Sequence, residues 1–206
     1  MKIVLASGSP RRREILELLA LDCVVRPPYV QETILEGMGP EEEARRLAVA
    51  KAAATVSDPG ELVVAADTLV ALDDEILGKP VDSADAFRML MRLQGRRHEV
   101  FTGLAVSLNG RIEAEVAITS VWFRLLDGAE CAEYVATGEP LDKAGAYGIQ
   151  GLGAALVQRI EGEYFNVMGL PVQLLLSLLD RFGLRYAYGS LEGTVIQQPD
   201  DPGARG

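Results

Sequence analysis

The sequence predicts an α/β fold with a mixed, twisted sheet and flanking helices. Short apolar runs of strand length alternate with segments whose apolar residues recur at helical spacing. Two long apolar segments are joined through Asn109-Gly110, a dipeptide typical of β-hairpins. The alternation favours parallel strands and the hairpin adds antiparallel ones, so we expect both in one sheet. The 206 residues suit a single domain, and no internal repeat divides them.

The first expected elements are a strand over 2–6 and a helix that begins at Pro10. Proline suits the first position of a helix, and Ser9 before it is a candidate N-cap. A second short strand is expected over 23–26, before a pair of prolines. The loop that follows carries Glu32.

Three consecutive arginines occupy the first turn of the first helix, where a cation costs roughly 0.3–1 kcal/mol. Arg13 can pair with Glu17 one turn later, whereas Arg11 and Arg12 have no obvious partner. Free backbone N–H groups and two guanidiniums at one helix start are typical of an anion site. We favour a phosphate site here over a solvated basic turn.

A second helix is expected from Pro40, because acidic residues fill its first turn. Its apolar stripe consists of Ala44, Leu47, Ala48, Ala52 and Thr55. Lys51 falls in the middle of this stripe. Its side chain either extends out to water or, if buried, needs an anionic partner inside a cleft.

A continuous apolar run over 62–66 predicts a strand that is buried on both faces. The run ends at Asp67 and Thr68, and residues at the carboxyl end of such a strand commonly face a ligand crevice. The chain then continues extended over 69–72 into the Asp73-Asp74 turn.

The remaining elements follow from capping and turn residues. A helix capped by Ser83 should end near Gln94, and the two hairpin strands should span 99–108 and 112–125. Asp127 and Glu130 form a capping-box pattern for a helix that stops at Gly138. The later segments are a glycine-rich stretch over 138–153, a strand over 155–160, a helix over 171–183 and a last strand over 184–188.

Composition narrows the choice of partner and compartment. A net charge of −10 argues against nucleic acid or an anionic membrane as the main partner. Cys23 and Cys131 lie far apart without a CxxC motif, so they are expected to be buried thiols in a reducing cytoplasm. Lys2 is followed by too few apolar residues for a signal peptide, and no run approaches the roughly 18 residues of a membrane span. We expect a cytoplasmic protein.

The charged residues at loop and strand ends suit metal-assisted phosphate chemistry. The chain has no P-loop and no dinucleotide GxGxxG motif, and its single histidine, His98, is expected to be structural or exposed. The remaining candidates are the cations Arg11, Arg12, Lys51, Lys79 and Lys143 and the carboxylates Glu32 and Asp67. Cations neutralise phosphate oxygens, and magnesium takes one or two carboxylates together with substrate phosphates and water.

Six motifs resemble, in order, those of the Maf family of nucleoside triphosphate pyrophosphatases. They are ASGSPRR (6–12), AADT (65–68), GKP (78–80), HEVFTG (98–103), GEPLDKAGAYGIQG (138–151) and GLP (169–171). The resemblance implies the fold of the inosine triphosphate pyrophosphatases, with two lobes around a cleft. It also implies hydrolysis of a nucleoside triphosphate to the monophosphate and pyrophosphate.

The same resemblance assigns roles to individual positions. Asp67 matches the proton acceptor, and Glu32 together with Asp67 matches the carboxylates that hold Mg²⁺ or Mn²⁺. The phosphate-binding positions are Ser7, Arg11, Arg12, Lys51 and Lys79, and the positions linked to base selection are Arg11, Thr68 and Gln150. Threonine at position 68 favours the branch that acts on dTTP and UTP, with 5-methyl-UTP as a modified substrate.

Two alternatives stay open. The branch that prefers 7-methyl-GTP typically has glutamine where Thr68 stands. A nucleotide-binding regulator of septum formation without essential catalysis is the alternative from another class. We expect one domain over 1–188, a polar and largely disordered tail over 189–206, and, from the resemblance, a homodimer.

Overall fold

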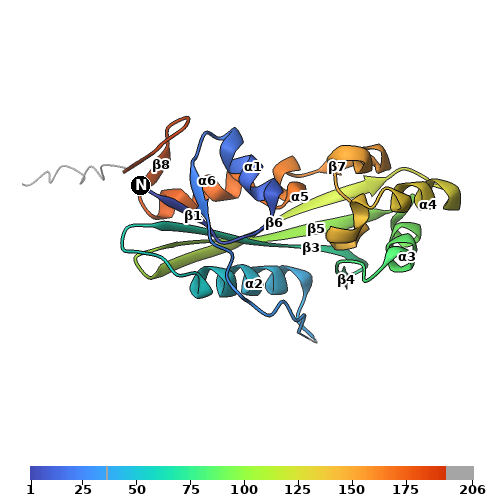
Figure 1. Cartoon of the computed structure of the whole chain (residues 1–206), viewed down its shortest axis with the longest axis horizontal. Helices are drawn as coiled ribbons and strands as arrows, with labels where there is room; N and C mark the ends of the chain where they lie inside the picture. The colour runs from blue at the N-terminus through green and yellow to red at the C-terminus, as the bar shows by residue number, and fades with distance from the viewer. Residues whose placement is uncertain (36, 194–206) are drawn as a thin grey trace, which may run out of the picture.

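The computed structural model describes residues 1–35 and 37–193 and confirms the α/β class. Its centre is a mixed sheet of seven strands in the order β2-β1-β3-β5-β6-β7, with β4 also paired to β3 (Figure 1). These strands are β1 (Ile3–Leu5), β2 (Cys23–Val25), β3 (Leu62–Leu72), β4 (Glu75–Leu77), β5 (Arg97–Leu108), β6 (Arg111–Phe123) and β7 (Val157–Glu161). Strands β1, β2 and β3 run parallel to one another, and the pairs from β3 onwards are antiparallel.

Helices cover both faces of this sheet (Figure 1). The helices are α1 (Pro10–Leu18), α2 (Pro40–Ala54), α3 (Ser83–Leu93), α4 (Gly128–Ala136), α5 (Tyr164–Met168) and α6 (Val172–Arg181). Helix α2 lies on one face, whereas α1, α5 and α6 lie on the other (Figure 1). Helices α3 and α4 pack together at the far end of the long strands.

The predicted hairpin and the predicted turn after the third strand are both confirmed. Asn109 and Gly110 join β5 to β6 with φ angles of 51° and 82°, and the Asp73-Asp74 turn joins β3 to β4 with φ angles of 51° and 66°. The capping box of α4 also forms, since Asp127 accepts from the Glu130 N–H and Glu130 accepts from the Asp127 N–H. In these places the local sequence alone determines the backbone.

The apolar interior is divided into two lobes. One lobe holds the side chains beneath α1, α2 and α6, and the other holds those beneath α3 and α4. Under α2 the packed side chains are mainly alanines, and Gly103 on β5 lies directly against the backbone of Ala44. The small residues let α2 approach the sheet closely.

The structure corrects the expected end of the third strand. Strand β3 continues through Asp67 and Thr68 to Leu72, because β5 pairs with it without interruption from Leu62 to Ala71. On its other edge, β1 pairs only with residues 62–64 and β4 only with residues 70–72. Asp67 and Thr68 therefore lie between these two partners rather than at a strand end.

Smaller corrections concern the ends of elements. Asp82, not Ser83, caps α3, since its side chain accepts from the Asp85 N–H at 2.7 Å. Cys23 is half-buried rather than buried, whereas Cys131 is buried as expected. The glycine-rich stretch forms three short 3₁₀ helices at Glu139–Asp142, Ala144–Ala146 and Gly151–Leu156, and α5 has no counterpart among the predicted elements.

The C-terminal strands form a sheet of their own. Strand β8 (Leu184–Tyr186) pairs with β9 (Leu191–Gly193), so regular structure continues beyond the expected domain end at residue 188. The rest of the expected tail, 194–206, lies outside the described residues. Within 1–35 and 37–193, no helix combines the length and the apolar character needed to cross a membrane.

Candidate active site

A cavity of about 900 Å³ opens where β3 lacks a neighbouring strand. Its walls come from both lobes: the start of α1, helix α2, the loop after β4, the glycine-rich stretch and the end of α5. The structure brings every predicted site residue to this cavity, namely Ser7, Arg11, Arg12, Glu32, Lys51, Asp67, Thr68, Lys79 and Gln150. A cavity of this size is typical of small-molecule sites.

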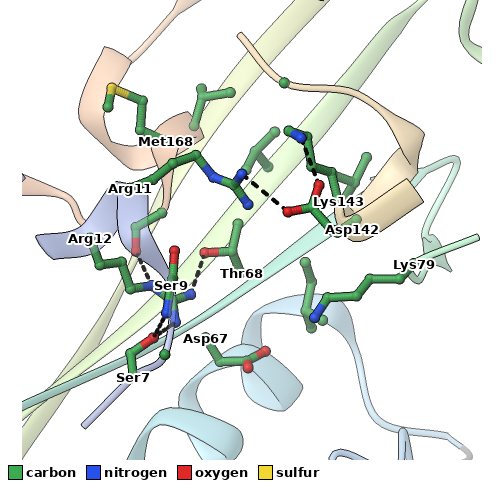
Figure 2. A pocket seen from close by; sticks show the side chains of 18 of the residues that line it. Ser7, Ser9, Arg11, Arg12, Asp67, Thr68, Lys79, Asp142, Lys143 and Met168 are labelled. Atoms are coloured by element: carbon green, nitrogen blue, oxygen red, sulfur yellow. Dashed lines mark hydrogen bonds and ion pairs between the residues drawn. The ribbon is translucent and has the colours of Figure 1, made fainter. Parts of the chain in front are cut away.

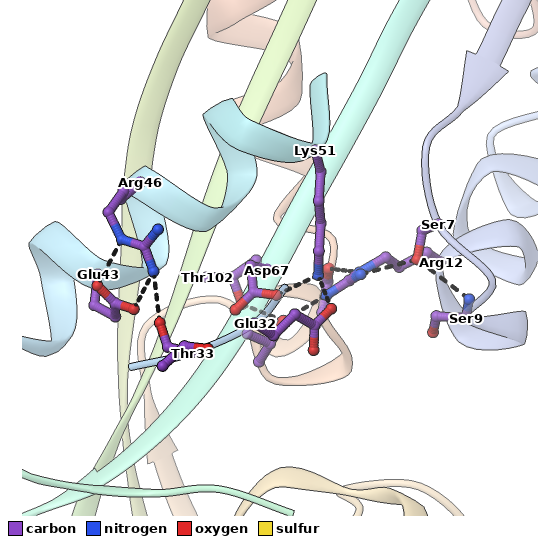
Figure 3. A network of polar contacts seen from close by, with 12 residues as sticks. Ser7, Ser9, Arg12, Glu32, Thr33, Glu43, Arg46, Lys51, Asp67 and Thr102 are labelled. Atoms are coloured by element: carbon purple, nitrogen blue, oxygen red, sulfur yellow. Dashed lines mark hydrogen bonds and ion pairs between the residues drawn. The ribbon is translucent and has the colours of Figure 1, made fainter. Parts of the chain in front are cut away.

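The centre of the cavity is a lysine held between two carboxylates (Figure 3). The Lys51 Nζ lies 2.5 Å from Asp67 Oδ1 and 2.5 Å from Glu32 Oε1. Lys51 and Asp67 are both buried, whereas Glu32 is half exposed on its loop. Lys51 therefore does not extend to water; it has the anionic partners that its burial requires.

Burial and charge act in opposite directions on the two carboxyl groups. Burial raises the pKa of Asp67, although Lys51 and Arg12 favour its ionised form. Burial also disfavours the charged form of Glu32, but the hydrogen bond and charge of Lys51 outweigh it and leave the pKa of Glu32 lowered. Burial thus favours the protonated form of Asp67, which suits a proton acceptor.

Arg12 joins three separate segments at the cavity wall (Figure 2). Its Nε donates to the Gly169 carbonyl at 2.7 Å, and its terminal nitrogens donate to Ser7 Oγ at 2.9 Å and to Thr68 Oγ1 at 3.1 Å. Burial lowers the pKa of this guanidinium, with Asp67 and Glu32 acting against that effect. Arg12, for which the sequence offers no obvious partner, thus has three, and two of them, Thr68 and Gly169, lie far away in sequence.

Arg11 faces an acidic partner across the cavity (Figure 2). Its guanidinium lies 3.6 Å from Asp142 Oδ2, and Asp142 Oδ1 accepts from Lys143 Nζ at 2.6 Å. Sequence reasoning missed Asp142, although it lies inside the GEPLDKAGAYGIQG motif beside the candidate Lys143. The start of α1 thus makes an ion pair with the glycine-rich stretch.

The other predicted residues complete the wall. Lys79, on the loop after β4, extends towards the space beside Asp67 (Figure 2), and its charge helps to lower the pKa of Glu32. Gln150 lines the cavity on the glycine-rich stretch.

His98 is buried behind the glycine-rich stretch, where its Nε2 lies 2.7 Å from the hydroxyl of Tyr147. Burial lowers the pKa of His98 to about 3. Its structural role is confirmed, and it is not exposed.

An ion pair on α2 between a buried carboxylate and a half-buried guanidinium holds the loop that carries Glu32 (Figure 3). Glu43 is fully buried and accepts from Arg46, whose guanidinium also donates to the Thr33 carbonyl at 2.9 Å. Sequence reasoning missed this pair. Glu43 lies four residues before Leu47 and eight before Lys51, so the helical spacing places it on the same face towards the sheet. This spacing could have identified Glu43 as a buried carboxylate.

The donor set fits a divalent cation that is shared with a substrate. Among the described residues, no group of three or more histidine, cysteine, aspartate or glutamate side chains is arranged to hold a metal. Glu32 and Asp67 nevertheless direct one oxygen each at a single cationic point, now the ammonium of Lys51. Two carboxylates are what Mg²⁺ takes from a protein when phosphates and water supply its other ligands.

Comparisons with known proteins find relatives over most of the chain. The family model described as Maf-like protein matches residues 2–182. Curated relatives named dTTP/UTP pyrophosphatase include proteins of Anaeromyxobacter dehalogenans, 51% identical over 88% of this chain and 94% of the relative, and Moorella thermoacetica, 50% identical over 89% and 96%. A solved structure of the Staphylococcus aureus Ham1 protein is 16% identical, with a TM-score of 0.45 over 88% of this chain and all of that one.

Proposed function

Because this chain belongs to the Maf family, we propose that it is a nucleoside triphosphate pyrophosphatase that acts on dTTP and UTP. The reaction gives the nucleoside monophosphate and pyrophosphate. The observation that carries the proposal is one cavity in which Lys51 bridges Asp67 and Glu32, with further cations around them. This combination suits a polyanionic substrate and a proton acceptor at the same point.

Asp67 is the proposed proton acceptor. The oxygen of a water molecule attacks the α-phosphorus, the bond from that phosphorus to the bridging oxygen breaks, and pyrophosphate leaves with the bonding electrons. Asp67 takes the proton of the attacking water, which the pKa raised by its burial favours. Its position in the middle of β3, fixed by β5, holds the carboxylate rigidly.

The cations bind the triphosphate. Arg11 on α1, Lys51 on α2 and Lys79 on the loop after β4 all line the cavity, so their charges surround the space where the phosphates would lie. They stabilise the negative charge that develops on the leaving pyrophosphate. Arg12 adds charge and also holds Ser7 and Thr68 in place through its hydrogen bonds.

Glu32 and Asp67 are the residues that would hold Mg²⁺ or Mn²⁺. Such an ion supplies Lewis-acid charge to phosphate oxygens and lowers the pKa of a bound water. Lys51 contacts one oxygen of each carboxylate, which leaves the second oxygen of each for the ion.

The decisive experiment is pyrophosphate release from UTP by the purified chain with Mg²⁺. We expect release by the wild type and a loss of at least about 100-fold in kcat for Asp67→Asn, the scale of general acid–base catalysis. Asp73→Asn, at the exposed β3–β4 turn, is the matched control. Near-normal turnover by Asp67→Asn would refute the assignment, and UTP binding without turnover by the wild type would favour the regulator.

Hydrolysis rates for dTTP, UTP, 5-methyl-UTP, CTP and 7-methyl-GTP would show to which branch of the family the chain belongs. We expect the uracil and thymine nucleotides to have the highest kcat/KM. A preference for 7-methyl-GTP would place the chain in the other branch.

We also propose a homodimer, which sedimentation would show as twice the 22.2 kDa mass of the chain.

A further inference from the structure

A chain of hydrogen bonds leads from the cavity wall into the interior. Arg12 donates to Thr68 Oγ1 at 3.1 Å, and Thr68 Oγ1 lies 3.1 Å from Thr102 Oγ1. Thr102 Oγ1 in turn lies 3.0 Å from the backbone carbonyl oxygen of Asn166. Thr68 lines the cavity, whereas Thr102 is fully buried beneath it, on β5 directly opposite Thr68 in the sheet register.

Only one arrangement of protons makes all three contacts hydrogen bonds. The Asn166 carbonyl has no hydrogen to give, so the single hydroxyl hydrogen of Thr102 points to it. The Thr68–Thr102 contact then needs the hydrogen of Thr68. Arg12 has no acceptor atom, so it can only donate to Thr68.

This arrangement makes Thr68 a pure acceptor towards the cavity. Its hydrogen is directed inwards to Thr102, and Arg12 takes one of its two lone pairs. One lone pair is left for a ligand. A ligand group that approaches this hydroxyl therefore has to donate a hydrogen.

We propose that Thr102 is a positioning residue for base preference, because it fixes Thr68 as a hydrogen-bond acceptor. Uracil and thymine carry a donor at N3, whereas N3 of cytosine is an acceptor. With N3 of the base at this hydroxyl, the hydroxyl accepts from uracil and thymine and presents a lone pair to the lone pair of cytosine N3. A site that leaves a buried polar group unpaired rejects the wrong ligand strongly.

The proposal rests on the proposed function, since it assumes a pyrimidine triphosphate in the cavity. It deepens that function by naming a buried residue that would not contact the substrate. The glycine-rich stretch and Arg11 lie on the same side of β3 as Thr68, and the Lys51 cluster lies on the side of α2 (Figures 2 and 3). The base would then lie on the Thr68 side of β3, and the reacting phosphates would lie on the side of Lys51 and α2.

The test is the binding preference of Thr102→Val, measured by calorimetry with the non-hydrolysable α,β-methylene analogues of UTP and CTP. Valine keeps the shape of threonine and removes the acceptor for the Thr68 hydrogen, so that hydrogen can turn towards the cavity. We expect the ratio of the CTP-analogue to UTP-analogue dissociation constants to fall about tenfold, the scale of one hydrogen bond. Thr102→Ser retains the hydroxyl and should restore the wild-type ratio.

Thr119→Val is the matched control. Thr119 is another buried threonine, on β6, and its hydroxyl contacts the Glu163 carbonyl and the Asn166 side chain without touching Thr68. Its removal disturbs the same α5 segment, but we expect the binding ratio to stay at the wild-type value. An unchanged ratio in Thr102→Val, an equal fall in Thr119→Val, or no preference in the wild type would each overturn the proposal. Absence of pyrophosphate release by the wild type would instead overturn the proposed function.

Discussion

Lys51 offsets the repulsion and the burial cost of the two carboxylates that lie close together in the cavity. Without a cation between them, Asp67 and Glu32 would repel each other, and burial would favour a proton on at least one of them. The ammonium lies 2.5 Å from an oxygen of each and opposes both effects. Against the effect of burial, it therefore extends to lower pH the range in which Asp67 is available as a base.

Replacement of Lys51 by methionine should shift the pH dependence of turnover. Lys51 acts to lower the pKa of Asp67 against its burial, so its removal lets that pKa rise further. Asp67 works in its ionised form, so the acidic side of the kcat/KM profile for UTP should move to higher pH, in addition to a lower maximum. Arg88→Met, which removes an exposed cation, is the control. An acidic side that stays in place would show that Lys51 does not set the pKa of Asp67.

Single residues show where sequence reasoning works and where it stops. The helical spacing of α2 identified Lys51 as a candidate buried lysine, and burial required an anion near it. It could not identify Glu32 and Asp67 as that anion, because a loop and a strand far away in sequence supply them. Their positions at loop and strand ends made both carboxylates candidates, and the resemblance assigned their roles. The partners of Arg12 and the hydroxyl of Thr102 depend on packing and left no pattern in the sequence.

At the scale of elements, the contact between α2 and β5 determines how precisely the site is assembled. A Cβ atom at Gly103 would overlap the carbonyl oxygen of Ala44 and would lie 2.8 Å from the Arg45 nitrogen. These are backbone atoms of the helix that carries Lys51, so no side chain can simply rotate away. The helix has to move as a whole.

Gly103→Ala should therefore reduce both stability and turnover. Overpacking of this kind costs about 1–3 kcal/mol, and displacement of α2 would separate Lys51 from Asp67. Urea unfolding measures the first effect and pyrophosphate release the second. Gly128→Ala, at the start of α4 with only one ordinary contact at 3.9 Å, should be close to neutral. A fully active Gly103→Ala enzyme would mean that the helix tolerates the shift.

The ends of the three parallel strands are held together by an ion cluster around Glu61. Its carboxylate accepts from Arg26 at 2.5 and 3.0 Å, from Lys2 at 2.6 Å and from the Asp58 N–H at 2.9 Å. These hydrogen bonds lower the pKa of Glu61 to about 2, and those from Arg26 have the largest effect, followed by that from Lys2. Arg26 follows β2, Lys2 precedes β1, and Glu61 precedes β3.

This lowered pKa predicts part of the acid sensitivity of the protein. The stabilisation is fully present above the unfolded pKa of 4.5 and is lost as the pH falls from there towards about 2. Glu61→Gln should reduce stability near neutral pH and flatten the decline below pH 4.5, as measured by thermal unfolding across that range. Glu42→Gln, on the exposed side of α2, is the control. An acid decline as steep as that of the wild type would contradict the assignment.

Elements with local signals were predicted well, and those that depend on distant pairing were not. The Asn109-Gly110 hairpin and the capping box of α4 are fixed by a few neighbouring residues. Strand β3 was ended too early, since the polar pair Asp67-Thr68 looked like a boundary and its continuation depends on β5. Helix α5 has only five residues, too few to show a helical period.

At the scale of the whole molecule, the cavity exists because β1 and β4 share one edge of β3 and leave a gap between them. The resulting walls combine segments from near the start of the chain, from its middle and from around residue 169. The alternation of strands and helices predicted the fold class, but not which segments would meet at this gap. Only the ordered set of motifs linked them in advance.

A ligand that contacts both lobes should stabilise the whole fold. The α,β-methylene analogue of UTP cannot be hydrolysed and would bind Arg11 and Lys51 in one lobe while it contacts the glycine-rich stretch of the other. At a concentration of 100 times its dissociation constant, binding adds about 2.7 kcal/mol to the free energy of unfolding. For a chain of this size that corresponds to a rise in Tm of roughly 5–10 °C.

The contributions of the triphosphate and of the base can then be separated. Uridine lacks the phosphates, so at the same concentration it should raise Tm far less, and Lys51→Met should lose most of the shift with the analogue. The Glu61 cluster lies away from the cavity, so Glu61→Gln should retain the shift from its lower starting Tm. A shift with uridine equal to that with the analogue would mean that the cations around Asp67 do not bind the phosphates, because the binding energy would then come from the base and sugar alone.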